Sequence, residues 1–128
     1  MKKPAEERAH LISISRLRRE RGVEVSVMSF RGAVRETTED DFRRRLEEAG
    51  ERSPYLMVVL SDLEYVSPVG LEHLLTQARV QKRRGGWLRI VSPSPEIAMI
   101  LEVSGAAAEL RAAATERDAL RDLPSRAA

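Results

Sequence analysis

An unbroken run of apolar residues, Leu56 to Leu60, lies near the middle of the chain. A strand without polar alternate positions must be covered on both faces, so this run predicts a central strand of a sheet with helices packed on it. At the junction that follows, Ser67 suits an N-cap and Pro68 suits the first helical position. Beyond it, four apolar residues repeat at i, i+3, i+4 and i+7, the spacing of one helical stripe: Leu71, Leu74, Leu75 and Ala78.

Three shorter patterns predict further strands. Leu11 to Ser15 partly alternates, which predicts an edge strand followed by a charged turn from Arg16 to Gly22. From Val23 to Phe30 the valines alternate with other residues, and this predicts a second strand that forms a hairpin with the first and is broken by Gly32. The segment from Trp87 to Val91 predicts a short strand.

Capping signals place helices between the strands. Thr37 and Thr38 precede three carboxylates, and both a capping hydroxyl and negative charge suit a helix start. The alanine-rich stretch from Ala106 to Ala114 is compatible with a helix or a last short strand. The helix after Thr38 points three apolar residues inward: Phe42, Leu46 and Ala49. The other predicted helices span Pro68 to Arg84, Pro95 to Val103 and Thr115 to Leu123. This alternation predicts an α/β layer structure whose later strands are largely parallel.

Composition narrows the function classes. The 128 residues suit one domain, and the absence of cysteine excludes disulfides, thiolate metal sites and cysteine nucleophiles. The 22 basic and 20 acidic residues give a net charge of +2, and the basic clusters are mixed with acids and lack aromatic platforms, so nucleic-acid binding is not expected. No apolar stretch approaches the length of a membrane span, and no apolar signal segment is visible, which predicts a cytoplasmic protein without membrane insertion.

No arrangement of residues typical of catalysis is visible. The two histidines, His10 and His73, are isolated from each other and from any regular set of carboxylates, so neither a metal site nor a catalytic triad is predicted. Gly85-Gly86 follows a helix and precedes a strand, the wrong order for a phosphate-binding loop. The sequence therefore predicts a binding module with no catalytic residue, metal or cofactor.

The segment from Val58 to Leu71 resembles the STAS domains of bacterial anti-sigma-factor antagonists. The usual family line is a hydrophobic strand, Asp-Leu, two or three residues, and Asp-Ser-Ser-Gly-Leu at the start of a helix. Three further segments match in order: Arg31 to Val34, Arg84 to Val91, and Ser94 to Gly105. The resemblance covers residues 10–123, with 1–9 as a flexible lead-in and 124–128 as a C-terminal tail. It implies a single STAS-like α/β domain with a four- to five-stranded mixed sheet and helices mainly on one side.

In those antagonists an anti-sigma kinase phosphorylates the first serine of Asp-Ser-Ser-Gly, and the unmodified form binds that kinase. Here Pro68 occupies the acceptor position and has no hydroxyl, so phosphorylation there is chemically impossible. Ser67 replaces the preceding acid and Arg35 replaces the acid of the earlier corner, so both carboxylates of the family site are missing. The resemblance thus implies a non-enzymatic protein-interaction domain that binds constitutively or serves as a scaffold without the switch.

The predicted partner surface combines the corner from Gly32 to Thr37 with the first turn of the Ser67 helix. The partner is a protein, with an anti-sigma factor or serine kinase as the leading candidate. Alternatives are a homo-oligomeric scaffold of a stress-signalling or transporter-associated complex and a small-molecule or lipid-handling module. A second hypothesis makes Ser67 an alternative phosphosite, since a helix N-terminus and a cation both stabilise negative charge. The predicted surface residues are Arg35, Glu36, Thr37, Ser67, Pro68, Val69, Gly70 and Glu72.

Overall fold

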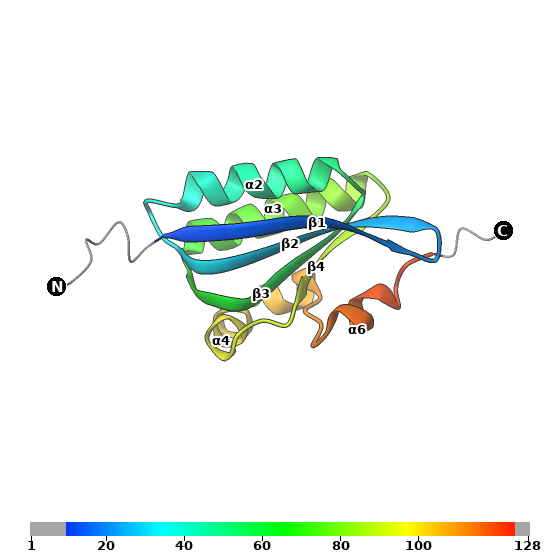
Figure 1. Ribbon diagram of the computed structural model, residues 1–128. Helices are drawn as coiled ribbons and strands as arrows, with labels where there is room; N and C mark the ends of the chain where they lie inside the picture. The colour runs from blue at the N-terminus through cyan, green and yellow to red at the C-terminus, as the bar shows by residue number, and fades with distance from the viewer. Residues whose placement is uncertain (1–9, 125–128) are drawn as a thin grey trace.

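The computed structural model describes residues 10–124, and the predicted lead-in and residues 125–128 of the predicted tail lie outside the described residues. Its four-stranded sheet has the order β1-β2-β3-β4 (Figure 1). The first pair of strands is antiparallel and the other two pairs are parallel, so the predicted mixed α/β sheet is confirmed. The strands are β1 (Leu11–Glu20), β2 (Val23–Val34), β3 (Tyr55–Val66) and β4 (Trp87–Val91).

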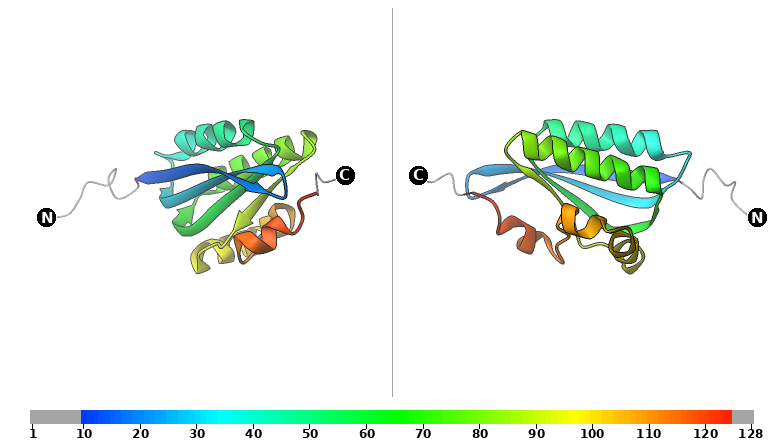
Figure 2. Two further views of the ribbon diagram at one scale, coloured as in Figure 1. Left: turned by 45° about the vertical axis from the view of Figure 1, so that its right-hand side comes forward. Right: turned by 180° about the vertical axis from the view of Figure 1, so that it is seen from behind.

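Helices cover the two faces of the sheet unequally. The long helices α2 and α3 lie side by side on one face, and α4 and α5 contribute residues to the same hydrophobic cluster (Figures 1 and 2). The short α6 covers part of the opposite face, where a second cluster forms. The predicted central strand is buried between these clusters, as part of β3. The helices are α2 (Glu39–Glu51), α3 (Pro68–Arg83), α4 (Pro95–Ser104), α5 (Ala106–Leu110) and α6 (Glu116–Leu120).

The first hairpin is longer than its apolar pattern indicated. The predicted charged turn from Arg16 to Gly22 is wrong, because β1 pairs with β2 as far as Glu20. The turn is only Arg21-Gly22, and both residues have positive φ, 52° and 81°, as tight two-residue hairpins require. Arg16 and Arg18 remain in the strand because both contact Glu116 of α6, at 2.5 and 3.0 Å. A distant carboxylate therefore extends the strand through charged positions.

Gly32 bends β2 and does not break it, so the predicted end of this strand is also wrong. The strand continues to Val34, with register shifts against β3 on both sides of Gly32. Gly32 adopts φ +105°, which is open to glycine and strained for other residues. The resulting bulge adds twist and carries the strand end toward the start of α3.

Side-chain caps begin three helices, including α3, whose cap Ser67 was predicted. Ser67, Ser94 and Thr115 each accept a hydrogen bond from the backbone N–H three residues later. Thr38 is the N-cap of α2, but its hydroxyl makes no capping bond. It donates instead to the carbonyl of Ala33 at 2.9 Å and accepts from the backbone N–H of Arg35 at 2.9 Å. Thr38 therefore closes the corner between β2 and α2.

The C-terminal part resolves an alternative that the sequence left open. The stretch from Ala106 to Ala114 forms a short helix, α5, and then a single bridge in which Ala113 pairs with Val91. The last helix ends at Leu120, so the predicted end at Leu123 is wrong. Gly105 follows α4 in the left-handed conformation, with φ +80°, and thus ends that helix.

Asp41, in the first turn of α2, gives a pH-dependent prediction. Its carboxylate contacts Arg44 at 2.6 Å and Arg45 at 2.7 Å. Burial alone would raise the pKa of this carboxyl, but the two arginines outweigh that effect and hold the pKa below its ordinary value. Because a depressed pKa stabilises the fold only while the group is ionised, this contribution is present above the unfolded-state pKa. It is lost as pH falls through the folded-state pKa.

We therefore expect Asp41→Asn to lower the free energy of unfolding near neutral pH by about 0.5 to 1 kcal/mol. The difference from the unsubstituted protein should shrink toward zero in acid, where Asp41 is protonated in both states. Urea unfolding measured across this pH range checks the expectation. Asp40→Asn is the matched control, because Asp40 lies in the same helical turn and forms no ion pair among the described residues. Equal pH profiles for the two variants would contradict the role of the arginine pair.

Candidate functional site

The end of β2 and the start of α3 meet at Ser67. The backbone N–H of Ser67 donates to the carbonyl of Val34 at 2.9 Å, which ties the two segments together. The Ser67 hydroxyl accepts from the N–H of Gly70 at 3.1 Å and donates to the Glu39 carboxylate at 2.6 Å. Ser67 is only 7% exposed. It is thus a buried helix cap whose hydroxyl is already used as donor and acceptor.

Glu39 brings a carboxylate to this site from a position other than the two where the family has acids. The residue belongs to the first turn of α2, and its Oε2 lies 2.6 Å from the Ser67 hydroxyl oxygen. The acidic run after Thr38 indicated only a helix start, because nothing local shows that this turn faces α3. Pairing two helix N-termini through one carboxylate is also electrostatically favourable, since both termini carry partial positive charge.

The predicted surface residues divide into an exposed layer and a support beneath it. Ser67 and Gly70 are buried. A Cβ on Gly70 would lie 2.7 Å from side-chain atoms of both Val34 and Val66, so only glycine lets α3 start this close to the two strand ends. We call the exposed residues the corner surface: Arg35, Glu36, Thr37, Pro68, Val69 and Glu72.

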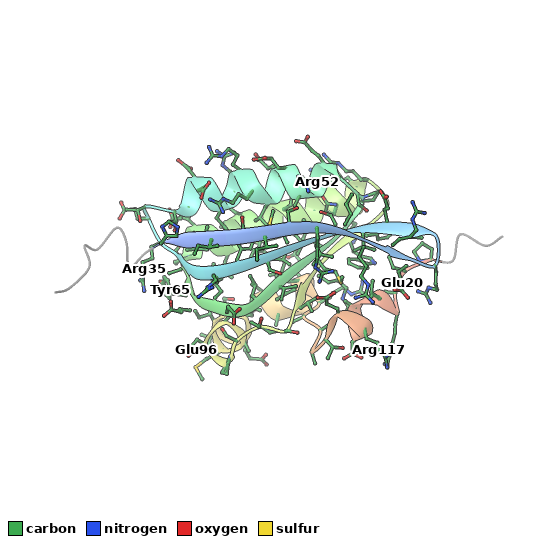
Figure 3. The ribbon with its side chains drawn as sticks, in the orientation of Figure 1. Glu20, Arg35, Arg52, Tyr65, Glu96 and Arg117 are labelled. Carbon is green, nitrogen blue, oxygen red and sulfur yellow. The ribbon has the colours of Figure 1, made fainter. Side chains whose placement is uncertain are left out.

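Arg35, which the phosphosite hypothesis pairs with Ser67, contacts the ring of Tyr65. Its guanidinium carbon lies 4.6 Å from the centroid of the Tyr65 ring, a cation–π contact (Figure 3). Among the described residues no hydrogen bond joins Arg35 to Ser67. Tyr65 is half-buried and borders the corner surface, and the sequence pattern did not single it out. The contact therefore adds an aromatic ring to the border of the corner surface.

Residues 10–124 contain neither a metal-binding cluster nor a membrane-spanning helix. Within this range no three acidic, histidine or cysteine side chains gather closely enough to bind a metal ion. In the same range, no helix combines the length and apolar character needed to cross a membrane.

The geometry defines an α/β domain with an exposed helix start at one corner of its sheet. The model of the STAS domain family matches residues 10–119. The chain therefore belongs to the STAS domain family, as the resemblance implied. A comparison with curated proteins found no match.

Solved structures share this fold. An anti-sigma factor antagonist from Mycobacterium paratuberculosis is 22% identical, with 86% of this chain and 92% of that chain covered and a TM-score of 0.70. Unphosphorylated SpoIIAA, an anti-sigma factor antagonist, is 18% identical, with 84% and 95% covered and a TM-score of 0.65. The phosphorylated form of SpoIIAA from Bacillus is 19% identical, with 84% and 97% covered and a TM-score of 0.58.

A larger protein also contains the fold. The murine Slc26a9 anion transporter is 12% identical, with 76% of this chain and 17% of that chain covered and a TM-score of 0.64. The predicted STAS-like architecture is confirmed by these likenesses.

Proposed function

We propose that this protein is a non-enzymatic interaction domain of the anti-sigma-antagonist type that binds a protein partner through the corner surface. One observation carries the proposal: the first turn of α3 presents Pro68 and Val69 to solvent, while the neighbouring hydroxyl of Ser67 is buried. An exposed, rigid, partly apolar helix start is suited to contact with another protein. Val69 is 45% exposed and is the large apolar side chain of the corner surface, so we place it at the centre of the contact.

The proposal includes constitutive binding, because neither Ser67 nor Pro68 at the start of α3 is a good phosphoacceptor. Pro68 lacks a hydroxyl. A phosphate on Ser67 would break its bond to Glu39, place two negative groups together, and force a buried side chain outward. The helix dipole and Arg35 were the arguments for such a phosphate, and the guanidinium is turned to Tyr65. The first hypothesis, a domain without the switch, thus has the stronger physical support.

The test is direct binding to purified serine kinases of the anti-sigma type from the source organism, measured by calorimetry. We expect one kinase to bind the unsubstituted chain and Val69→Asp to weaken that binding at least tenfold, about 1.4 kcal/mol. Leu17→Asp is the matched control, since Leu17 is also half-exposed, at 50%, and lies on β1 away from the corner surface. Equal loss with both variants, or no binding by any kinase, contradicts the proposal.

A phosphorylation assay separates the missing switch from the binding surface. With the bound kinase, ATP and Mg²⁺, intact-protein mass spectrometry should show no added phosphate on the unsubstituted chain. Pro68→Ser should gain one phosphate, because an exposed hydroxyl then occupies the helix start. Phosphate found on Ser67 of the unsubstituted chain would remove the claim of constitutive binding and leave the binding surface standing.

A further inference from the structure

Within residues 10–124, no strand pairs with the outer edge of β1. β1 is the first strand of the sheet order, and none of the described helices or strands lies beyond it in the views of Figures 1 and 2. Open edges usually carry charge or a covering element, because their free N–H and C=O groups can pair with another strand. The first half of this edge, Leu11 to Ser15, carries no charged residue.

The pairing with β2 shows which backbone groups are free. The N–H of Ala33 donates to the carbonyl of His10, so His10 points its backbone groups toward β2. Since antiparallel strands alternate strictly, Ile12 and Ile14 also bond inward, whereas Leu11, Ser13 and Ser15 direct their N–H and C=O groups outward. The free edge therefore offers three successive outward-facing residues for backbone pairing, and none of them is charged.

The side chains at these positions divide between the two faces of the sheet. The hydroxyls of Ser13 and Ser15 accept hydrogen bonds from Arg45 and Arg52 of the α2 segment, at 2.6 and 2.8 Å, so these serines face α2. Ile12 and Ile14 face the other way, where α6 covers only the far end of β1. They are 44% and 66% exposed. Two isoleucine side chains are therefore exposed to solvent next to an unpaired strand edge.

We infer that a second copy of this chain pairs with β1 in antiparallel orientation, with Ser13 opposite Ser13 of the second copy. A two-fold interface must be self-complementary. In this register Ser13 pairs with its symmetry mate, and Leu11 pairs with Ser15, through the outward backbone groups. Ile12 then lies opposite Ile14 of the second copy in the non-hydrogen-bonded positions, where side chains approach most closely. Two four-stranded sheets join into one.

Charge selects this register. Moving the two-fold axis to Ser15 would set Arg16 opposite Ile14 and Arg18 opposite Ile12, so two charges would replace the apolar contacts. With the axis at Ser13 both arginines lie beyond the five-residue overlap and keep their contacts with Glu116. A short overlap buries a small area, so the dimer should form with rising protein concentration.

The absence of cysteine makes the register measurable by single substitutions. In the inferred dimer Ser13→Cys places two Cα atoms about 5.5 Å apart, within disulfide range. Ser15→Cys and Leu17→Cys place theirs roughly 14 and 27 Å apart, since each residue advances a strand by about 3.4 Å. Mild oxidation should therefore cross-link Ser13→Cys alone. Equal cross-linking of all three variants, or preference for Ser15→Cys, would overturn the inferred register.

Sedimentation velocity of the unsubstituted chain tests the association itself. We expect a concentration-dependent dimer that Ile14→Lys returns to monomer, while Leu17→Lys leaves it unchanged. Both side chains are exposed, so both variants should keep the thermal unfolding transition of the unsubstituted chain, which circular dichroism verifies. A chain that remains monomeric at millimolar concentration overturns the inference. Val69→Asp should still dimerise, which keeps this result separate from the test of the corner surface.

Discussion

Replacing Gln81 by leucine is expected to lower the free energy of unfolding by about 3 kcal/mol. Gln81 is fully buried on α3, and its amide nitrogen donates to the carbonyls of Ser53 and Pro54 at 2.8 and 2.9 Å. Its amide oxygen accepts from Gln77 at 2.9 Å. Leucine fills a similar volume but leaves the Ser53 carbonyl and the Gln77 amide without their partners. Each buried group left unpaired costs about 1 to 3 kcal/mol.

Urea unfolding measures this loss, with an unchanged slope against denaturant if the variant remains fully folded. Thr76→Leu is the matched control, because this substitution introduces the same side chain at an exposed position of the same helix. Gln77→Leu removes only the bond to Gln81 and should cost about 1 kcal/mol. If Gln81→Leu lowers the free energy of unfolding no more than Thr76→Leu does, the loop before β3 relaxes to rebuild its hydrogen bonds. The hydrogen bonds of Gln81 would then not be what holds that loop.

The elements that sequence predicted best are those with local signals. The apolar run at Leu56 to Leu60 identified the central strand, and Ser67-Pro68 gave the start of α3 to the residue. The extent of β1 had no local signal. Arg16 and Arg18 belong to a strand because Glu116 neutralises them, and that carboxylate lies about a hundred positions later in the chain. Charge in a short window therefore indicated a turn where tertiary contacts stabilise a strand.

The candidate site shows the same limit. Pro68 and Val69 were identified from the sequence because a helix start requires particular residues, and both are exposed. Glu39 and Tyr65 were missed, since the first acts from another helix and the second through an arginine thirty positions earlier. Their roles depend on how β2, α2 and α3 converge at the corner, and no periodicity along the chain encodes that convergence.

Replacing Gly32 by alanine is expected to cost about 3 kcal/mol or more, because it adds a clash to backbone strain. A Cβ at this position would lie 1.9 Å from the carbonyl oxygen of His10, and φ is +105°. Gly85 provides a matched control: its φ is +86°, and a Cβ there meets nothing within 4 Å. Gly85→Ala should therefore cost only about 1 kcal/mol.

The difference between the two variants, measured by urea unfolding, isolates the clash from the conformational strain. Gly32 also leads directly to Val34, whose carbonyl holds the backbone of Ser67, so the damage should spread to the corner surface. Amide hydrogen exchange at Ser67 should consequently accelerate in Gly32→Ala and not in Gly85→Ala. Equal unfolding energies would mean that the start of β1 moves aside without cost, and the bulge at Gly32 would then not position the corner.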